Sequence, residues 1–141
     1  MNKEKVLTCL NDVLKLELAG VVRYTHYAFM VQGPYRLSIV NWLREQAKES
    51  LMHAEMVGEH ITSLGEHPTL KIGELLVTHK HSTEDSLNEC LQHERSAISA
   101  YYKLLKNIDG KSIMLEEFSS TMIATEEMHE AELKKMLKDN F

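Results

Sequence analysis

The chain has 141 residues, of which 43% are hydrophobic and 26% are charged, and its net charge is −5. This balance excludes a disordered chain and predicts a single domain over residues 1–141. Acids and bases are mixed along the whole length, so no basic patch predicts binding to nucleic acid or to a membrane surface. Charges within the first 18 residues argue against a signal peptide or a membrane span. Because Cys9 and Cys90 are isolated, we expect a reducing, cytoplasmic location.

The first half of the chain predicts two long helices. Glycine and proline are sparse, and "GP" at 33–34 separates two stretches that have helical periodicity. We expect the first helix at 3–32 and the second at 35–64, with Gly65 as the C-terminal stop of the second. Each would be about 40 Å long at 1.5 Å per residue.

The second half predicts another pair of helices. Ser82 and Asp85 form an acidic variant of the capping box that opens a helix ending near Ile108. Ser112 can cap a fourth helix that continues to about Lys138. A few residues join the helices within each pair, so the members of each pair should be antiparallel neighbours.

A connection of 17 residues, "EHPTLKIGELLVTHKHS", separates the two pairs. It is long enough to run the length of a bundle. The sequence therefore predicts an all-α fold, an antiparallel four-helix bundle with one long crossover and no fifth helix. The apolar "LKIGELLV" predicts one short helical turn packed on the bundle.

The inward-facing stripe of each predicted helix is apolar except near its middle. The positions that interrupt the four stripes are Glu17, Glu49 or Ser50, His53, Glu94, Glu126 and His129. No Lys or Arg lies on any stripe, so buried carboxylates at one level would repel each other and be forced to protonate. Divalent metal ions would supply the missing positive charge, and carboxylate oxygen with imidazole nitrogen suits iron, manganese or zinc.

Simpler readings of the single residues stay open. One Glu on an apolar stripe often reaches the surface, and one His there is more often a satisfied core residue than a ligand. "HEAEL" and "HERSA" lack the second histidine of a zinc-protease motif. "HKH" at 79–81 could bind metal loosely, although the favoured interpretation is a solvated loop. The argument for metal therefore depends on the coincidence of all four stripes.

Several segments resemble the ferritin-like superfamily, and its bacterioferritin branch in particular. "LELAGVVRYTHY" is similar to the family's first helix, "HAEMVGEHITSLGEHPTL" to the end of its second, "HERSAISAYYKLL" to its third and "EEMHEAEL" to its fourth. The resemblance implies two iron ions per subunit, with manganese or zinc as alternatives. The ligands implied are Glu17, His53, Glu94, Glu126 and His129, with Tyr24 as a nearby buried catalytic tyrosine. It also implies oxidation of Fe(II) by oxygen or peroxide, with storage of the ferric product in family cages.

The chain departs from that family pattern at three places. The bridging carboxylate three residues before His53 is replaced by Ser50, and we expect the adjacent Glu49 to act as the metal ligand instead. The haem-binding methionine two residues before that histidine is replaced by Leu51, so haem is not predicted. Only 12 residues follow His129, which is too few for the family's fifth helix.

Apolar residues on more than one face of "YRLSIVNWL" predict a homo-oligomer. Without a fifth helix we expect a dimer or a smaller Dps-like shell rather than the large cage.

These observations favour a di-iron ferroxidase, with iron storage or detoxification as a further role. Two alternatives remain. One is a di-metal oxidase or peroxidase of the rubrerythrin type, although the chain has no CxxC rubredoxin module. The other is a metal-free helical assembly protein. Metal analysis would separate the last from the others, and iron loading would separate storage from oxidase chemistry.

Overall fold

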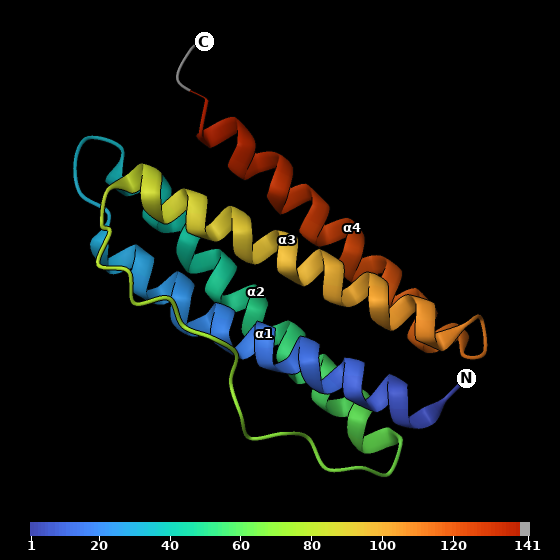
Figure 1. Cartoon of the computed structure of the whole chain (residues 1–141). Helices are drawn as coiled ribbons and strands as arrows, with labels where there is room; N and C mark the ends of the chain where they lie inside the picture. Colours follow the sequence, from blue (N-terminus) through green and yellow to red (C-terminus); the bar gives the residue numbers. More distant parts are fainter. Residues whose placement is uncertain (139–141) are drawn as a thin grey trace.

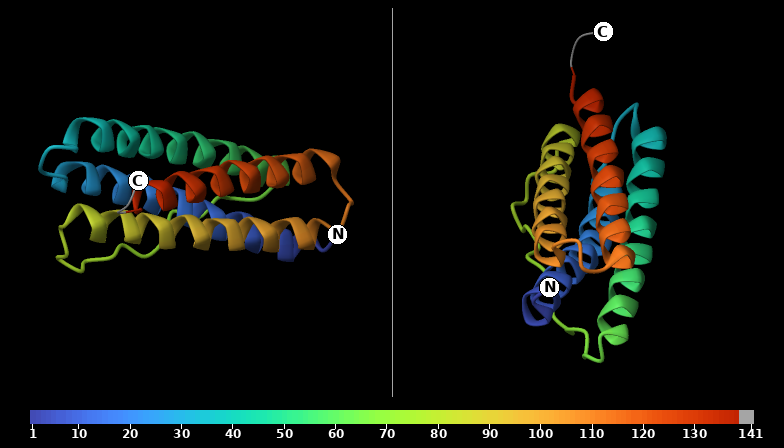
Figure 2. Two further views of the ribbon diagram at one scale, coloured as in Figure 1. Left: turned by 90° about the horizontal axis from the view of Figure 1, so that it is seen from above. Right: turned by 90° about the vertical axis from the view of Figure 1, so that its right-hand side faces the viewer.

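A computed structural model describes residues 1–138 and shows four long helices. They are α1 (Lys3–Met30), α2 (Arg36–Ser63), α3 (Thr83–Ile108) and α4 (Ile113–Met136). The helices lie side by side as a bundle (Figures 1 and 2). Within residues 1–138 there is no strand and no fifth helix, as predicted. Residues 139–141 of the predicted domain lie outside the described range.

The helix ends follow the capping residues expected from the sequence. The Ser82 hydroxyl accepts a hydrogen bond from the Asp85 N–H at 3.0 Å, and Ser112 accepts one from the Leu115 N–H at 3.3 Å. Gly65 follows α2 with φ +80°, a left-handed conformation that glycine adopts without strain. The observed bounds differ from the predicted ones by no more than two residues, the margin expected at fraying helix ends.

The crossover between α2 and α3 is extended, so the predicted short helical turn is wrong. Residues 66–81 contain no helix and run beside α1 (Figure 1). The Gly73 N–H donates to the Lys15 carbonyl at 2.9 Å, and the Thr69 N–H donates to Asn11 Oδ1 at 2.9 Å. An extended chain covers about 3.3 Å per residue and a helix only 1.5 Å. A helical turn would therefore shorten a segment that must span the bundle.

The apolar core forms two clusters with a polar layer between them. In chain order, α1 contributes Val13 to one cluster and Tyr24 to the other, with Glu17 between them. The order is reversed on α3, where Leu91 belongs to the cluster of Tyr24, Tyr101 belongs to the cluster of Val13, and Glu94 lies between them. Glu17 and Glu94 are only 3% and 2% exposed. The stripes are therefore interrupted at one level of the bundle, as the periodicity predicts. None of the helices in the described residues has an apolar stretch long enough to cross a bilayer.

Candidate metal centre

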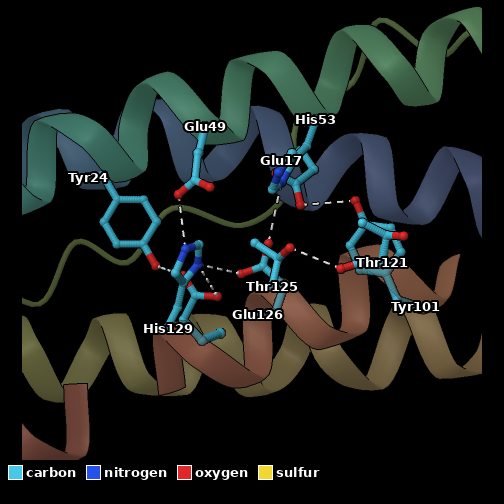
Figure 3. Close-up of polar contacts among 10 residues, drawn as sticks. Glu17, Tyr24, Glu49, His53, Tyr101, Thr121, Thr125, Glu126 and His129 are labelled. Carbon is cyan, nitrogen blue, oxygen red and sulfur yellow. Dashed lines mark hydrogen bonds and ion pairs between the residues drawn. The ribbon is translucent and has the colours of Figure 1, made fainter. Parts of the chain in front are cut away.

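Six polar side chains from all four helices meet in this layer. The six are Glu17 of α1, Glu49 and His53 of α2, Glu94 of α3, and Glu126 and His129 of α4. Figure 3 shows most of them pointing toward one another between the helices. Five of the six lie in two groups whose ligand atoms are close enough to hold a metal ion. Glu49 contacts the second group from its edge.

The first group contains Glu17, His53 and Glu126. One ligand atom from each residue lies within 4.8 Å of the others, and all three residues are buried. His53 Nδ1 lies 3.4 Å from Glu17 Oε2 and 3.4 Å from Glu126 Oε1. Two carboxylates and one imidazole thus converge from α1, α2 and α4.

The second group contains Glu94, Glu126 and His129. His129 Nδ1 lies 3.1 Å from Glu126 Oε2 and 3.7 Å from Glu94 Oε2. Glu126 therefore belongs to both groups and turns a different oxygen to each, Oε1 to His53 and Oε2 to His129. A carboxylate placed in this way can bridge two metal ions.

Each group contains one buried atom that lacks a hydrogen-bond partner. The two atoms are His53 Nδ1 and Glu94 Oε2. In the described part of the chain, no other buried side-chain nitrogen or oxygen atom lacks a hydrogen bond. Leaving a buried polar atom without a partner costs about 1–3 kcal/mol, and more where the group is charged. Both are donor types that coordinate iron, manganese or zinc. The residues therefore fit a pair of bound metal ions.

Glu49 and Ser50 occupy different surroundings on α2. Glu49 Oε2 lies 2.9 Å from His129 Nε2, and its side chain is 34% exposed. Ser50 is buried beside Gly20: a Cβ placed on Gly20 would lie 2.8 Å from Ser50 Oγ. The chain thus has a carboxylate near the second group, but it comes from the position before the one that the family pattern uses.

Two tyrosines hold the carboxylates from outside the groups. The Tyr24 hydroxyl donates to Glu94 Oε1, and the Tyr101 hydroxyl donates to Glu17 Oε1 at 3.1 Å. Burial, followed by the nearby carboxylate charges, raises the pKa of both tyrosines, so both hydroxyls keep their protons. Each proton fixes one oxygen of its carboxylate, and the remaining oxygen is left to face the group.

The electrostatics of the layer couple the imidazoles to the carboxylates. Burial lowers the pKa of His53, but the nearby carboxylates of Glu126 and Glu17 outweigh it and raise that pKa to about 10. The pKa of His129 is likewise raised to about 10 by Glu126 and Glu94 against the effect of burial. Burial and then Glu126 raise the pKa of Glu94 to about 7. Without metal, protons thus supply part of the positive charge that the carboxylates need.

Sequence reasoning did not assign roles to three nearby residues. Tyr101 lies seven residues after Glu94, a spacing that puts both side chains on the same helix face. His93 is buried, and its Nδ1 lies 3.0 Å from Arg23 Nη1. Burial, followed by the Arg23 charge, lowers the pKa of His93 to about 4, so it stays neutral. The sequence signal that could have identified His93 is its position directly before the predicted ligand Glu94.

Comparison with known proteins agrees with the four-helix fold. A family model described as a ferritin-like domain matches residues 7–140. Comparison with the curated proteins found no significant sequence match. Among solved structures, the chain resembles ferritin-like, diiron-carboxylate proteins from Bacillus anthracis str. Ames, at 26% identity and a TM-score of 0.89. That alignment covers 98% of this chain and 100% of the other.

Two further structures share the fold at lower identity. The bacterioferritin-related protein from Bacteroides fragilis, described as a dodecameric thioferritin, is 23% identical, with a TM-score of 0.90 over 99% of this chain and 88% of that one. Dps from Thermosynechococcus elongatus is 16% identical, with a TM-score of 0.91 over 98% of this chain and 93% of that one. The resemblance inferred from the helix segments is therefore confirmed at the level of the family. The family model spans nearly the whole chain, so this chain belongs to the ferritin-like domain family.

Proposed function

We propose that this chain binds two Fe(II) ions per subunit and oxidises them with oxygen or peroxide. The observation that carries the proposal is a pair of buried atoms that make no hydrogen bond, one in each group, on either side of a carboxylate that belongs to both. Without metal these atoms have only ion-pair contacts of 3.4 Å or longer. The similar Bacillus anthracis proteins, described as diiron-carboxylate proteins, support iron as the metal.

In this proposal each residue has a defined task. Glu17 and His53 hold the first ion, Glu94 and His129 hold the second, and Glu126 bridges them. Bound Fe(II) would supply the electrons, one per ion, that oxygen or peroxide accepts. The Tyr24 hydroxyl holds Glu94 beside the second ion and carries a proton at the edge of the site. The Tyr101 hydroxyl likewise holds Glu17 beside the first ion and carries a proton there.

Glu49 makes the second position more exposed than the first. Its side chain is 34% exposed and touches His129, whereas Glu17 and His53 are each about 3% exposed. We propose that Glu49 completes the second position in place of the bridging carboxylate missing at residue 50. Because Glu49 borders solvent, this is also the side from which Fe(II) would arrive.

We further propose that the chain works as a cytoplasmic homo-oligomer. Large apolar side chains are exposed to solvent around the turn between α1 and α2: Phe29 is 64% exposed, Tyr35 73% and Leu37 83%. Exposed apolar groups gathered at one place are typical of a subunit interface. The dodecameric relative from Bacteroides fragilis supports a shell, which storage of a ferric product would need.

An anaerobic Fe(II) titration followed by air tests the function. We expect about two ions per subunit and a rise in ferric absorbance when oxygen is admitted. Glu126→Ala removes the residue shared by both groups, so it should abolish binding at one position at least and slow oxidation. Glu127→Ala is the matched control, since Glu127 is the next residue on α4 and is exposed.

The outcomes separate the alternatives. Two ions in the parent and in Glu127→Ala, with fewer in Glu126→Ala, support the assignment. Equal stoichiometry in all three proteins would contradict it. A parent that binds no iron would favour the metal-free assembly protein, and bound iron that oxygen and peroxide leave as Fe(II) would refute the ferroxidase reaction.

A further inference from the structure

A cavity of about 330 Å³ lies between α1 and the crossover, away from the carboxylate layer. Its α1 wall includes Arg23, His26 and Tyr27, and its crossover wall runs from Leu75 to His81. Figure 1 shows this part of the crossover passing beside α1 before it enters α3. None of the cavity residues belongs to either group of the candidate metal centre.

Three histidines meet at this cavity from two separate segments. The ring centroids of His26 and His81 are 6.2 Å apart, and those of His79 and His81 are also 6.2 Å apart. His79 has φ +56°, a left-handed conformation that residues other than glycine rarely adopt. The backbone therefore turns at His79. The "HKH" motif is thus not two isolated loop histidines, because α1 adds a third imidazole beside it.

The three rings must turn toward one another to share one ion, because they are not among the groups whose ligand atoms all lie within 4.8 Å of one another. A metal–nitrogen bond of about 2.0–2.1 Å places the centroids of two imidazoles on one tetrahedral ion about 5–6 Å apart. The observed 6.2 Å is slightly longer, and all three side chains are exposed, so small rotations can close the difference. His81, which pairs with both of the others, would be the central ligand.

The charges around the cavity are mixed. The Arg23 guanidinium lies on its α1 wall, where its nitrogens are held 3.0 Å from His93 Nδ1 and 3.2 Å from the Tyr27 hydroxyl. The Glu89 carboxylate lines the cavity and accepts a hydrogen bond from Thr78 at 3.3 Å, so it supplies negative charge nearby. Lys80 also lines the cavity, but its long side chain is exposed and free to turn into solvent.

We propose that His26, His79 and His81 form a second cation site, which binds one divalent transition-metal ion through imidazole nitrogen. Three neutral nitrogen donors suit zinc, copper or nickel better than magnesium or calcium. This site is separate from the candidate metal centre, because the two share no residue.

Calorimetric titration of the full chain with Zn(II) tests this inference. We expect the parent to bind one more Zn(II) ion per chain than His81→Ala does. His26→Ala and His79→Ala should each weaken that ion at least tenfold. His67→Ala is the matched control: it removes an exposed histidine from the same crossover that lies outside the cavity. Circular dichroism of each variant confirms that the helices are retained.

The result is separable from the proposed iron chemistry. Glu126→Ala should keep the histidine-bound ion, and His81→Ala should keep Fe(II) oxidation. Equal Zn(II) stoichiometry and affinity in the parent and His81→Ala would overturn the proposal. It would also be overturned if binding depended on His81 but not on His26, because the ion would then belong to the loop alone.

Discussion

Replacing Gly20 by alanine should destabilise the protein, although the same change is usually favourable inside a helix. Gly20 lies on α1 where that helix approaches α2 and α3. A Cβ placed there would lie 2.8 Å from Ser50 Oγ, 3.3 Å from Ser50 Cβ and 3.0 Å from His93 Nε2. Rotation of Ser50 could move its hydroxyl but not its Cβ, so relief requires a shift of α2 or α3.

The size of the effect follows from two opposing contributions. Alanine gains about 0.5–1 kcal/mol over glycine in a helix interior. Overpacking a buried contact costs about 1–3 kcal/mol. The net loss should be on the order of 1 kcal/mol, which lowers Tm by about 2–4 °C for a domain of this size.

Gly58→Ala is the matched control for this change. Gly58 lies within α2, and a Cβ added there meets no atom within 4 Å. It should therefore show only the helix gain, a rise in Tm of about 1–4 °C. Thermal unfolding followed by circular dichroism, at one protein concentration because an oligomer's Tm depends on it, measures both.

The double variant identifies the cause. Adding Ser50→Ala to Gly20→Ala removes the nearer hydroxyl and should restore part of the lost stability. If Gly20→Ala and Gly58→Ala raised Tm equally, the close approach of the three helices at Gly20 would be refuted. A Gly20→Ala loss that Ser50→Ala leaves unchanged would place the strain at Ser50 Cβ or at His93 and not at the Ser50 hydroxyl.

Three further outcomes follow from the site and the surface. Glu49→Ala should weaken the second Fe(II) ion at least tenfold in an equilibrium titration while Ser50→Ala leaves both ions in place, and parent-like binding by Glu49→Ala would exclude Glu49 as a ligand. The nearby carboxylates raise the pKa of His53 and of His129 to about 10, so both are protonated at pH 7 and each bound ion should displace about one proton. The second ion should also displace a proton from the fraction of Glu94 that is protonated, since the pKa of Glu94 is raised to about 7. Affinity should therefore rise about tenfold per pH unit between pH 7 and pH 10. Calorimetry in buffers of different ionisation enthalpy counts the protons, and zero release would contradict the pKa shifts. Leu37→Glu should reduce the particle mass in light scattering if the exposed turn is an interface, and a parent protein that is already a monomer at micromolar concentration would count against association.

The helices and the level of the polar layer could be predicted from the sequence because both depend on local patterns. Helical periodicity, Ser82 and Ser112 as caps, and the glycine and proline breaks act over a few residues and set the helix bounds. The polar interruption at Glu17 and Glu94 is also visible in each stripe separately. Antiparallel packing of helices of similar length then places such interruptions at one depth, whatever the details of the contacts.

What the tertiary structure decided is how side chains distant in sequence meet. Periodicity could place Glu126 on the inward face, but only packing showed that its two oxygens face different histidines. The crossover was predicted with a helical turn because its apolar residues suggested burial, whereas the distance that it must span requires extended backbone. The approach of His26 to the "HKH" motif has the same origin: it depends on where the crossover passes α1, and no local pattern encodes that path.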